Sequence, residues 1–157
     1  MTAEFARALG KVPTEPRPPL PRRLLEASAH HDMVNTMAWE IDWEPIGDWL
    51  LGLDDRTYVQ VRAALGILAD RGPHLGRPLV DSVTTSRHPN MKELRPGSSG
   101  RSEIRILFAF DPHRRAIILV GGDKAGNWSR WYEVNVPLAD DRYDEHLREL
   151  RKGKADE

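Results

Sequence analysis

The sequence contains no cysteine, which excludes disulfide bonds, thiolate nucleophiles and zinc sites with cysteine ligands. It also has no hydrophobic run near the roughly 20 residues that a transmembrane helix needs, and its first residues lack the apolar stretch of a signal peptide. We therefore expect a cytoplasmic protein with no membrane partner. A large net charge is absent as well: 23 basic and 24 acidic side chains leave a net charge of −1, so the overall charge does not indicate a nucleic-acid partner.

The basic side chains are unevenly distributed along the chain. Residues 74–132 contain ten basic and five acidic side chains, whereas the remaining residues have a net charge of −6. His74, His88 and His113 lie in this basic segment too, where they add positive charge below about pH 6.5. We expect a polyanionic partner, if the protein has one, to bind this segment.

Composition divides the 157 residues into an arm, one domain and a short tail. Residues 1–37 are rich in proline and arginine, which is typical of polyproline II or disordered chain rather than packed structure. We expect this arm to be poorly ordered, and we interpret its His30 and His31 as a solvated pair because no third metal ligand follows at a suitable spacing. Residues 38–151 are the predicted domain, and residues 152–157 are a polar tail.

Hydrophobic periodicity predicts an α+β fold. Apolar and acidic side chains alternate over residues 39–44, as in a half-buried strand, and helical spacing follows over residues 46–53 and 55–72. Further strands are predicted near residues 81–86, 91–95, 103–110 and 116–120. A last helix is predicted after Pro137. We expect the two N-terminal helices to pack on one face of a mostly antiparallel sheet of three to five strands, with the C-terminal helix over the sheet's edge and the other face free of helices.

Strand alternation places three charged side chains together on the face that is predicted to be free of helices. If Ile106 and the apolar residues two positions away face the helices, Glu93, Arg95 and Arg105 point to the opposite side. Lys124 follows the last strand and can join them, and three aromatic residues lie near the same rim, Trp128, Trp131 and Tyr132. Cations beside aromatic rings suit the binding of phosphate groups and the stacking of bases. The alternative is a solvated polar face with an ion pair between Glu93 and Arg105.

Two other segments carry residue types that occur in active sites. His113 lies in a predicted hairpin turn, where it is a candidate general base. Residues 121–124 read Gly-Gly-Asp-Lys, but they lack the spacing and the flanking parallel strand and helix of a phosphate-binding loop. We interpret the two glycines as a turn that ends a strand.

Several short motifs resemble those of a known family. They are K-E-L-R at residues 92–95, R-S-E-I-R-I-L-F-A-F at 101–110, A-I-I-L-V-G-G-D-K at 116–124, and the helix after Pro137. In this order and spacing they resemble the RelE/ParE toxin superfamily, and most of all its HigB-like, phage-derived branch. The resemblance covers about residues 39–150 and implies a RelE-like fold.

The resemblance also implies an activity. It is that of a type II toxin-antitoxin toxin that cleaves mRNA on the ribosome without metal or cofactor, by attack of a 2'-hydroxyl on the adjacent phosphate. Arg105 matches the strand arginine that such toxins use on the scissile phosphate, Arg95 matches the arginine of E-L-R, and Lys124 matches the first lysine of a G-F-x-K-K motif. The implied proton carriers are Glu93, His113 and Tyr132. The implied RNA-binding residues are Lys92, Arg101, Trp128 and Trp131.

The implied partners are the ribosome, mRNA and a cognate antitoxin. The antitoxin is expected to be a helix-turn-helix, HigA-like protein that forms a hetero-oligomer with the toxin. The sequence departs from the family at Asp123, which replaces an apolar residue, and at Ala125, which replaces the second lysine. These departures leave two alternatives open, a ParE-like gyrase poison that acts by binding alone and an inactive, adapted relative.

Overall fold

A computed structural model describes residues 39–97 and 102–155. The predicted arm over residues 1–37 lies outside these described residues, as does Arg101.

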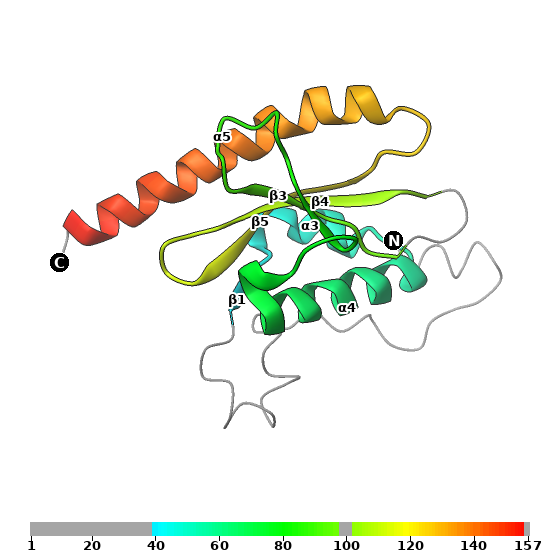
Figure 1. Ribbon diagram of the computed structural model, residues 1–157, viewed down its shortest axis with the longest axis horizontal. Coiled ribbons are helices and arrows are strands. Elements are labelled where there is room, and N and C mark those ends of the chain that lie inside the picture. Colours follow the sequence, from blue (N-terminus) through cyan, green and yellow to red (C-terminus); the bar gives the residue numbers. More distant parts are fainter. Residues whose placement is uncertain (1–38, 98–101, 156–157) are drawn as a thin grey trace.

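Five strands form a single mixed sheet at the centre of the fold (Figure 1). They are β1 (Glu40–Asp42), β2 (Val80–Ser82), β3 (Met91–Leu94), β4 (Ile104–Phe110) and β5 (Arg115–Asp123). The strand order is β1-β5-β4-β3-β2; β1 runs parallel to β5, and all other neighbours are antiparallel. The predicted α+β class and the mostly antiparallel sheet are confirmed.

Short helices and one long helix cover the first face of the sheet. They are η1 (Glu44–Ile46), α3 (Gly47–Leu51), α4 (Asp55–Arg71) and the turn η2 (Gly72–His74). The carboxylate of Asp54 caps α4 by accepting a hydrogen bond of 2.8 Å from the backbone N–H of Thr57. Apolar residues at helical spacing, including Val61, Leu65 and Leu68, then pack against Ile106 and other residues of the sheet.

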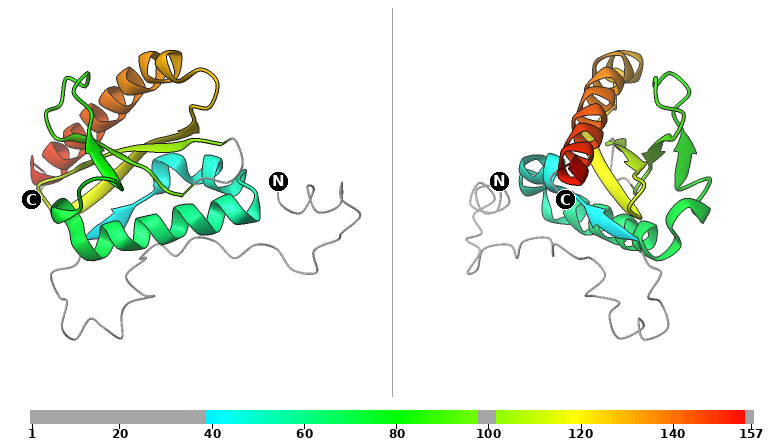
Figure 2. Two further views of the ribbon diagram at one scale, coloured as in Figure 1. Left: turned by 45° about the vertical axis from the view of Figure 1, so that its right-hand side comes forward. Right: turned by 90° about the vertical axis from the view of Figure 1, so that its left-hand side faces the viewer.

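The second face is covered by a helix, so the prediction of an open face is wrong. Helix α5 (Trp128–Ala155) crosses this face, opposite α4 (Figures 1 and 2). Its Val136, Ala139 and Tyr143 pack with Leu107 and Leu119 of the sheet. The reason is visible in the central strands, which carry apolar residues at successive positions and must therefore be buried on both faces.

The start of α5 differs from the expected one. Pro137 lies inside the helix, nine residues after its first residue, and not ahead of it. Proline cannot donate the hydrogen bond to the carbonyl four residues earlier, which belongs to Glu133. Both residues are exposed, so water can solvate that carbonyl and the helix continues. The polar tail that was predicted from residue 152 is part of this helix as far as Ala155.

The glycine pair at residues 121–122 lies within β5, where a turn was expected. A Cβ atom on Gly121 would lie 2.4 Å from the Trp49 ring, and one on Gly122 would lie 2.5 Å from Nε1 of Trp131. Trp49 packs with the core below the sheet and Trp131 with the core above it. The two glycines therefore let one tryptophan approach the strand on each face.

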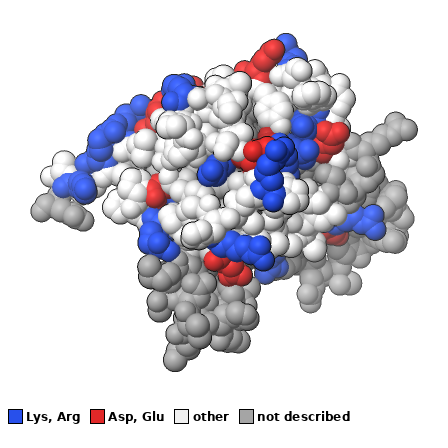
Figure 3. Space-filling model, viewed as in Figure 1, with Lys and Arg blue, Asp and Glu red and all other residues white. Residues whose placement is uncertain are grey.

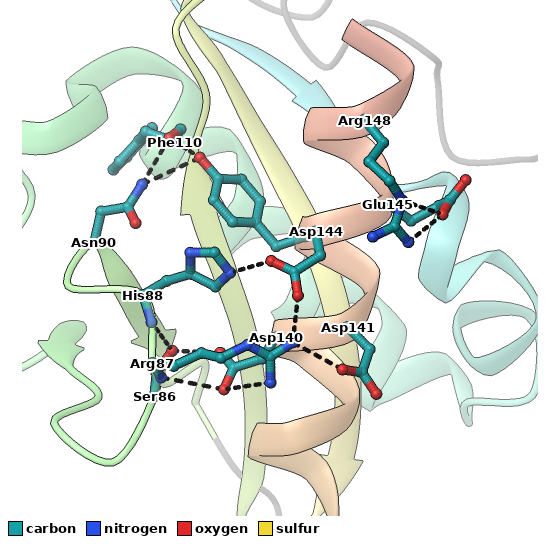
Figure 4. Close-up of polar contacts among 11 residues, drawn as sticks. Ser86, Arg87, His88, Asn90, Phe110, Asp140, Asp141, Asp144, Glu145 and Arg148 are labelled. Carbon is teal, nitrogen blue, oxygen red and sulfur yellow. Dashed lines mark hydrogen bonds and ion pairs between the residues drawn. The ribbon is translucent and has the colours of Figure 1, made fainter. Parts of the chain in front are cut away.

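The loop between β2 and β3 is bound to α5 by a network of polar side chains (Figure 4). The buried Asp140 accepts hydrogen bonds from Ser86 Oγ and from the backbone N–H of Arg87. The Arg87 guanidinium also contacts Asp141 and Asp144, and Asp144 lies 2.7 Å from Nε2 of His88. This network fixes the middle of α5 relative to the sheet's β2–β3 edge.

Among the described residues, no helix combines the length and the apolar composition that crossing a membrane requires.

Candidate active site

The three charged residues that were expected to share a face do meet, at the end of the sheet near the start of α5. Glu93 is at the third position of β3 and Arg95 directly follows the strand, while Arg105 is at the second position of β4. Glu93 Oε1 lies 2.9 Å from Nε of Arg95 and 3.7 Å from Nε of Arg105. The carboxylate of Glu93 is therefore shared by two guanidinium groups.

The two arginines have further contacts that restrict their positions. Arg95 Nη2 lies 3.3 Å from the Asp81 carboxylate on the edge strand β2. Arg105 Nη1 donates a hydrogen bond of 2.7 Å to the carbonyl of Ile104. The hydrogen bond with Glu93 raises the pKa of Arg95 above its ordinary value, so this guanidinium is positively charged at every relevant pH.

Tyr132 reaches this group from the second turn of α5. Burial raises the pKa of its phenol well above the ordinary value, and the neighbouring Glu93 carboxylate raises it further. The phenol is therefore protonated at neutral pH and can donate a proton or a hydrogen bond.

Lys124 lies beside the group and contacts two aromatic rings. Its Nζ atom lies 5.2 Å from the centre of the Trp128 ring and 5.4 Å from that of Tyr132, which is within the range of cation–π interaction. Nζ also lies 3.9 Å from a carboxylate oxygen of Glu103. Trp128 is 58% exposed, so much of its side chain is accessible from solvent. Trp131 packs on Gly122 and edge-on to Tyr132, and so contributes to the core instead.

Arg95 and Lys124 have acidic partners, Asp81 and Glu103, that were not among the predicted site residues. Strand pairing is the signal that could have identified Asp81, because this residue lies opposite Glu93 in the observed register. With Glu93, these residues place three carboxylates beside three cations. Figure 3 shows a similar mixture of acidic and basic atoms over the viewed face, which has no continuous basic surface.

Two of the predicted site residues that the structure describes, Lys92 and His113, do not join this group. Lys92 alternates with Glu93 and so points to the opposite face of the sheet. His113 lies in the turn after β4, where its backbone N–H donates to Asp111, whereas Arg105 is near the beginning of that strand. A β-strand rises about 3.4 Å per residue, so the five steps from Arg105 to Phe110, at the end of β4, span about 17 Å. Arg101 lies outside the described residues.

The arrangement suits the binding of one phosphate group. Two half-buried guanidinium groups and an ammonium supply charge-assisted hydrogen bonds, and a neutral phenol supplies a further donor. The part of the chain that the structure describes has no group of three His, Asp or Glu side chains arranged to hold a metal ion.

Comparisons with known proteins place this chain in a family. Residues 48–144 match the model of the phage-derived Gp49-like proteins. The chain is also similar to two proteins of Mycobacterium tuberculosis H37Rv that are named as toxins. It is 53% identical to HigB2 over 122 residues and 52% identical to HigB3 over 99 residues. The match to HigB2 covers 78% of this chain and 61% of HigB2, so the chain spans less than two thirds of that relative. The match to HigB3 covers 63% of this chain and 84% of HigB3. No solved structure matches the chain significantly. The matches confirm the resemblance found in the motifs: this chain belongs to the phage-derived Gp49-like family and is similar to HigB proteins.

Proposed function

We propose that this chain is the toxin of a type II toxin-antitoxin pair and that it inhibits translation by cleaving mRNA on the ribosome. The toxin assignment is supported by the names of two relatives with more than half of their matched residues identical. The nuclease assignment is supported by one observation above all: Arg95 and Arg105 share the Glu93 carboxylate next to Lys124 and the exposed ring of Trp128. Such a site fits a phosphate group with an adjacent unpaired base.

The proposed reaction is an attack within the RNA that requires a base for the 2'-hydroxyl proton and an acid for the leaving oxygen. The 2'-oxygen of one nucleotide attacks the adjacent phosphorus and loses its proton to a base, while the bond from phosphorus to the 5'-oxygen breaks and that oxygen gains a proton. The products are a 2',3'-cyclic phosphate and a 5'-hydroxyl end. Arg95, Arg105 and Lys124 stabilise the negative charge that builds up on the phosphate oxygens. Tyr132 is protonated and is therefore suited to donate the proton to the leaving oxygen.

The proposed partner is an antitoxin, which a host needs in order to survive such a toxin. We expect it to be a helix-turn-helix, HigA-like protein that is produced with the chain and forms a hetero-oligomer with it. Co-purification of a small DNA-binding protein from an adjacent gene would support this proposal. Growth of a host that makes the chain alone would contradict it.

The function is tested by inducing the chain in a bacterial host and following growth together with the integrity of translated messages. Wild type should stop growth and fragment messages, whereas Arg105→Ala should restore growth because it removes a phosphate ligand outside the hydrophobic core. Arg56→Ala is the matched control, since it removes the same charge from an exposed position on α4. Intact messages during full arrest would contradict the nuclease proposal, and cleaved DNA in those cells would indicate a gyrase poison.

A further inference from the structure

Glu93 has an environment that is unusual for a residue of its type. It is 2% exposed and is the only buried glutamate among the described residues. Burial of a carboxylate is unfavourable unless the charge is paired and hydrogen-bonded. The contacts of the Glu93 carboxylate therefore indicate its function.

The carboxylate contacts the same atom of two arginines. Oε1 lies 2.9 Å from Nε of Arg95 and 3.7 Å from Nε of Arg105. Nε is the inner end of a guanidinium, next to the aliphatic chain, and the two Nη groups are its outer end. Each guanidinium is held at a second point as well, Arg95 by Asp81 and Arg105 by the carbonyl of Ile104. These contacts fix the direction in which the two outer ends point.

Glu93 is poorly placed to take a proton from a substrate. A general base must come within hydrogen-bonding distance of the group that it deprotonates. Glu93 Oε2 is buried and has no hydrogen-bond partner among the residues that the structure describes, and the same is true of Arg105 Nε. Unpartnered buried polar atoms are rare in proteins and require an explanation. Here one atom belongs to the Glu93 carboxylate and the other to the Arg105 guanidinium, which approach each other through Oε1 and Nε at 3.7 Å, and we interpret this pair as the constrained centre of the site.

We infer that Glu93 is a positioning residue, whose buried carboxylate holds Arg95 and Arg105 as a pair for one phosphate group, and that it carries no proton in the reaction. This inference rests on the proposed function, because it takes the RNA phosphate as the ligand. Without the carboxylate, two like charges on neighbouring strands would repel each other, and the positions of the two guanidinium groups would no longer be fixed by a shared partner.

Two substitutions distinguish positioning from proton transfer. Glu93→Gln keeps the length of the side chain and an oxygen that accepts from Nε, but it cannot act as a base, and Glu93→Ala removes the anchor altogether. Cleavage of a reporter message on purified ribosomes should fall by about 100-fold in Glu93→Ala, the cost of a misplaced catalytic group. It should fall by less than about tenfold in Glu93→Gln. Equal losses of about 100-fold or more in both variants, which removal of a general base predicts, would overturn the inference.

Binding is measured separately with a short single-stranded RNA whose 2'-hydroxyls are methylated, so that it cannot react. Glu103→Gln is the matched control, because it removes an equal charge beside Lys124 from a side chain that is 49% exposed. We expect Glu93→Gln to bind this RNA within about threefold of Glu103→Gln, and Glu93→Ala to bind it about tenfold more weakly. Tighter binding by Glu93→Ala than by Glu103→Gln would overturn the inference, because it would show that Glu93 competes with the phosphate.

A third readout does not depend on RNA. In NMR spectra the Nε–H group of Arg95, which donates a hydrogen bond to Glu93, should exchange slowly with water in wild type and in Glu93→Gln, and rapidly in Glu93→Ala. Thermal unfolding of each variant shows whether it is folded. If this pattern of exchange is observed but wild type neither binds nor cleaves RNA, the proposed function is wrong. The contact by which Glu93 holds the arginine would then still be shown. Rapid exchange in wild type would overturn the anchor itself.

Discussion

Gly122 sets how closely α5 approaches the sheet at the candidate site. The Trp131 indole lies against the backbone of Gly122, and a Cβ atom there would be 2.5 Å from Nε1 of that ring. Trp131 in turn packs edge-on to Tyr132, with ring centres 5.1 Å apart. A residue without a side chain in β5 thus helps to place the phenol beside Glu93.

This contact predicts opposite effects for two glycine-to-alanine substitutions. Gly122→Ala should lower the free energy of unfolding by about 1–3 kcal/mol, because Trp131 must move out of its packed position. Gly66→Ala should raise it by about 0.5–1 kcal/mol, because Gly66 lies inside α4 and, among the described residues, no atom beyond its chain neighbours and the nearby helix backbone lies within 4 Å of the new Cβ. Urea denaturation measures both values. Equal effects of the two substitutions would show that Trp131 does not restrict residue 122.

Strand alternation alone was sufficient to place Glu93, Arg95 and Arg105 on one face, because each residue along a strand reverses the direction of its side chain. It did not identify Asp81, since β2 is a strand of three residues whose register depends on the loop that joins it to β3. It also could not show that Lys124 lies over two aromatic rings. That contact depends on where α5 begins.

At the scale of elements, α5 and the β2–β3 loop support each other (Figure 4). Asp140 has a side chain that is 5% exposed and accepts hydrogen bonds from the loop, whereas the side chain of Asp141 is 71% exposed and pairs with Arg87 at the surface. The buried carboxylate therefore contributes more to the docking of the loop than the exposed one.

The neighbouring aspartates provide a matched pair of substitutions. Asp140→Ala should lower the free energy of unfolding by about 1–3 kcal/mol, because the Ser86 hydroxyl and the Arg87 N–H lose a buried acceptor. Asp141→Ala should change it by less than about 0.5 kcal/mol, as is usual for an exposed ion pair. Chemical denaturation gives the stabilities, and hydrogen exchange of residues 83–90 reports whether the loop has detached. Similar losses in both variants would contradict the assignment of the docking contact to Asp140.

The sequence predicted the α5 segment only in part. Its apolar spacing after Pro137 was recognised, but the preceding helical turns were not, since proline is a strong signal for a helix start. The exposed position of Pro137 makes it tolerable inside the helix, and exposure is a property of the packed structure. The earlier start is what places Tyr132 at the candidate site.

At the scale of the whole molecule, local charge pairs replace a general positive field. The chain has a net charge of −1, and each cation of the site has an acidic neighbour in Glu93, Asp81 or Glu103. Long-range attraction of RNA should therefore be weak, and affinity should depend on direct contacts with phosphate groups.

The salt dependence of RNA binding tests this view. If Arg95, Arg105 and Lys124 contact phosphates, the logarithm of the affinity for single-stranded RNA should fall against the logarithm of salt concentration with a slope of about −2, at roughly 0.7 per contact. Replacing Arg95 and Arg105 together by alanine should flatten the slope by about 1.4. Replacing Arg56 and Arg62 on α4, beneath the other face of the sheet, should leave it unchanged. The same slope in both double variants would show that RNA does not bind at this site.

The sequence by itself determined the α+β class, the positions of most strands, the family and the grouping of Glu93 with two arginines. Each of these follows from local pattern: side-chain alternation, helical spacing and short motifs in a fixed order. Only the tertiary structure decided that α5 covers the second face and that every cation of the site has a carboxylate beside it. These features depend on contacts between segments far apart in the chain, and such contacts are set by packing and by strand register rather than by the residues next to them.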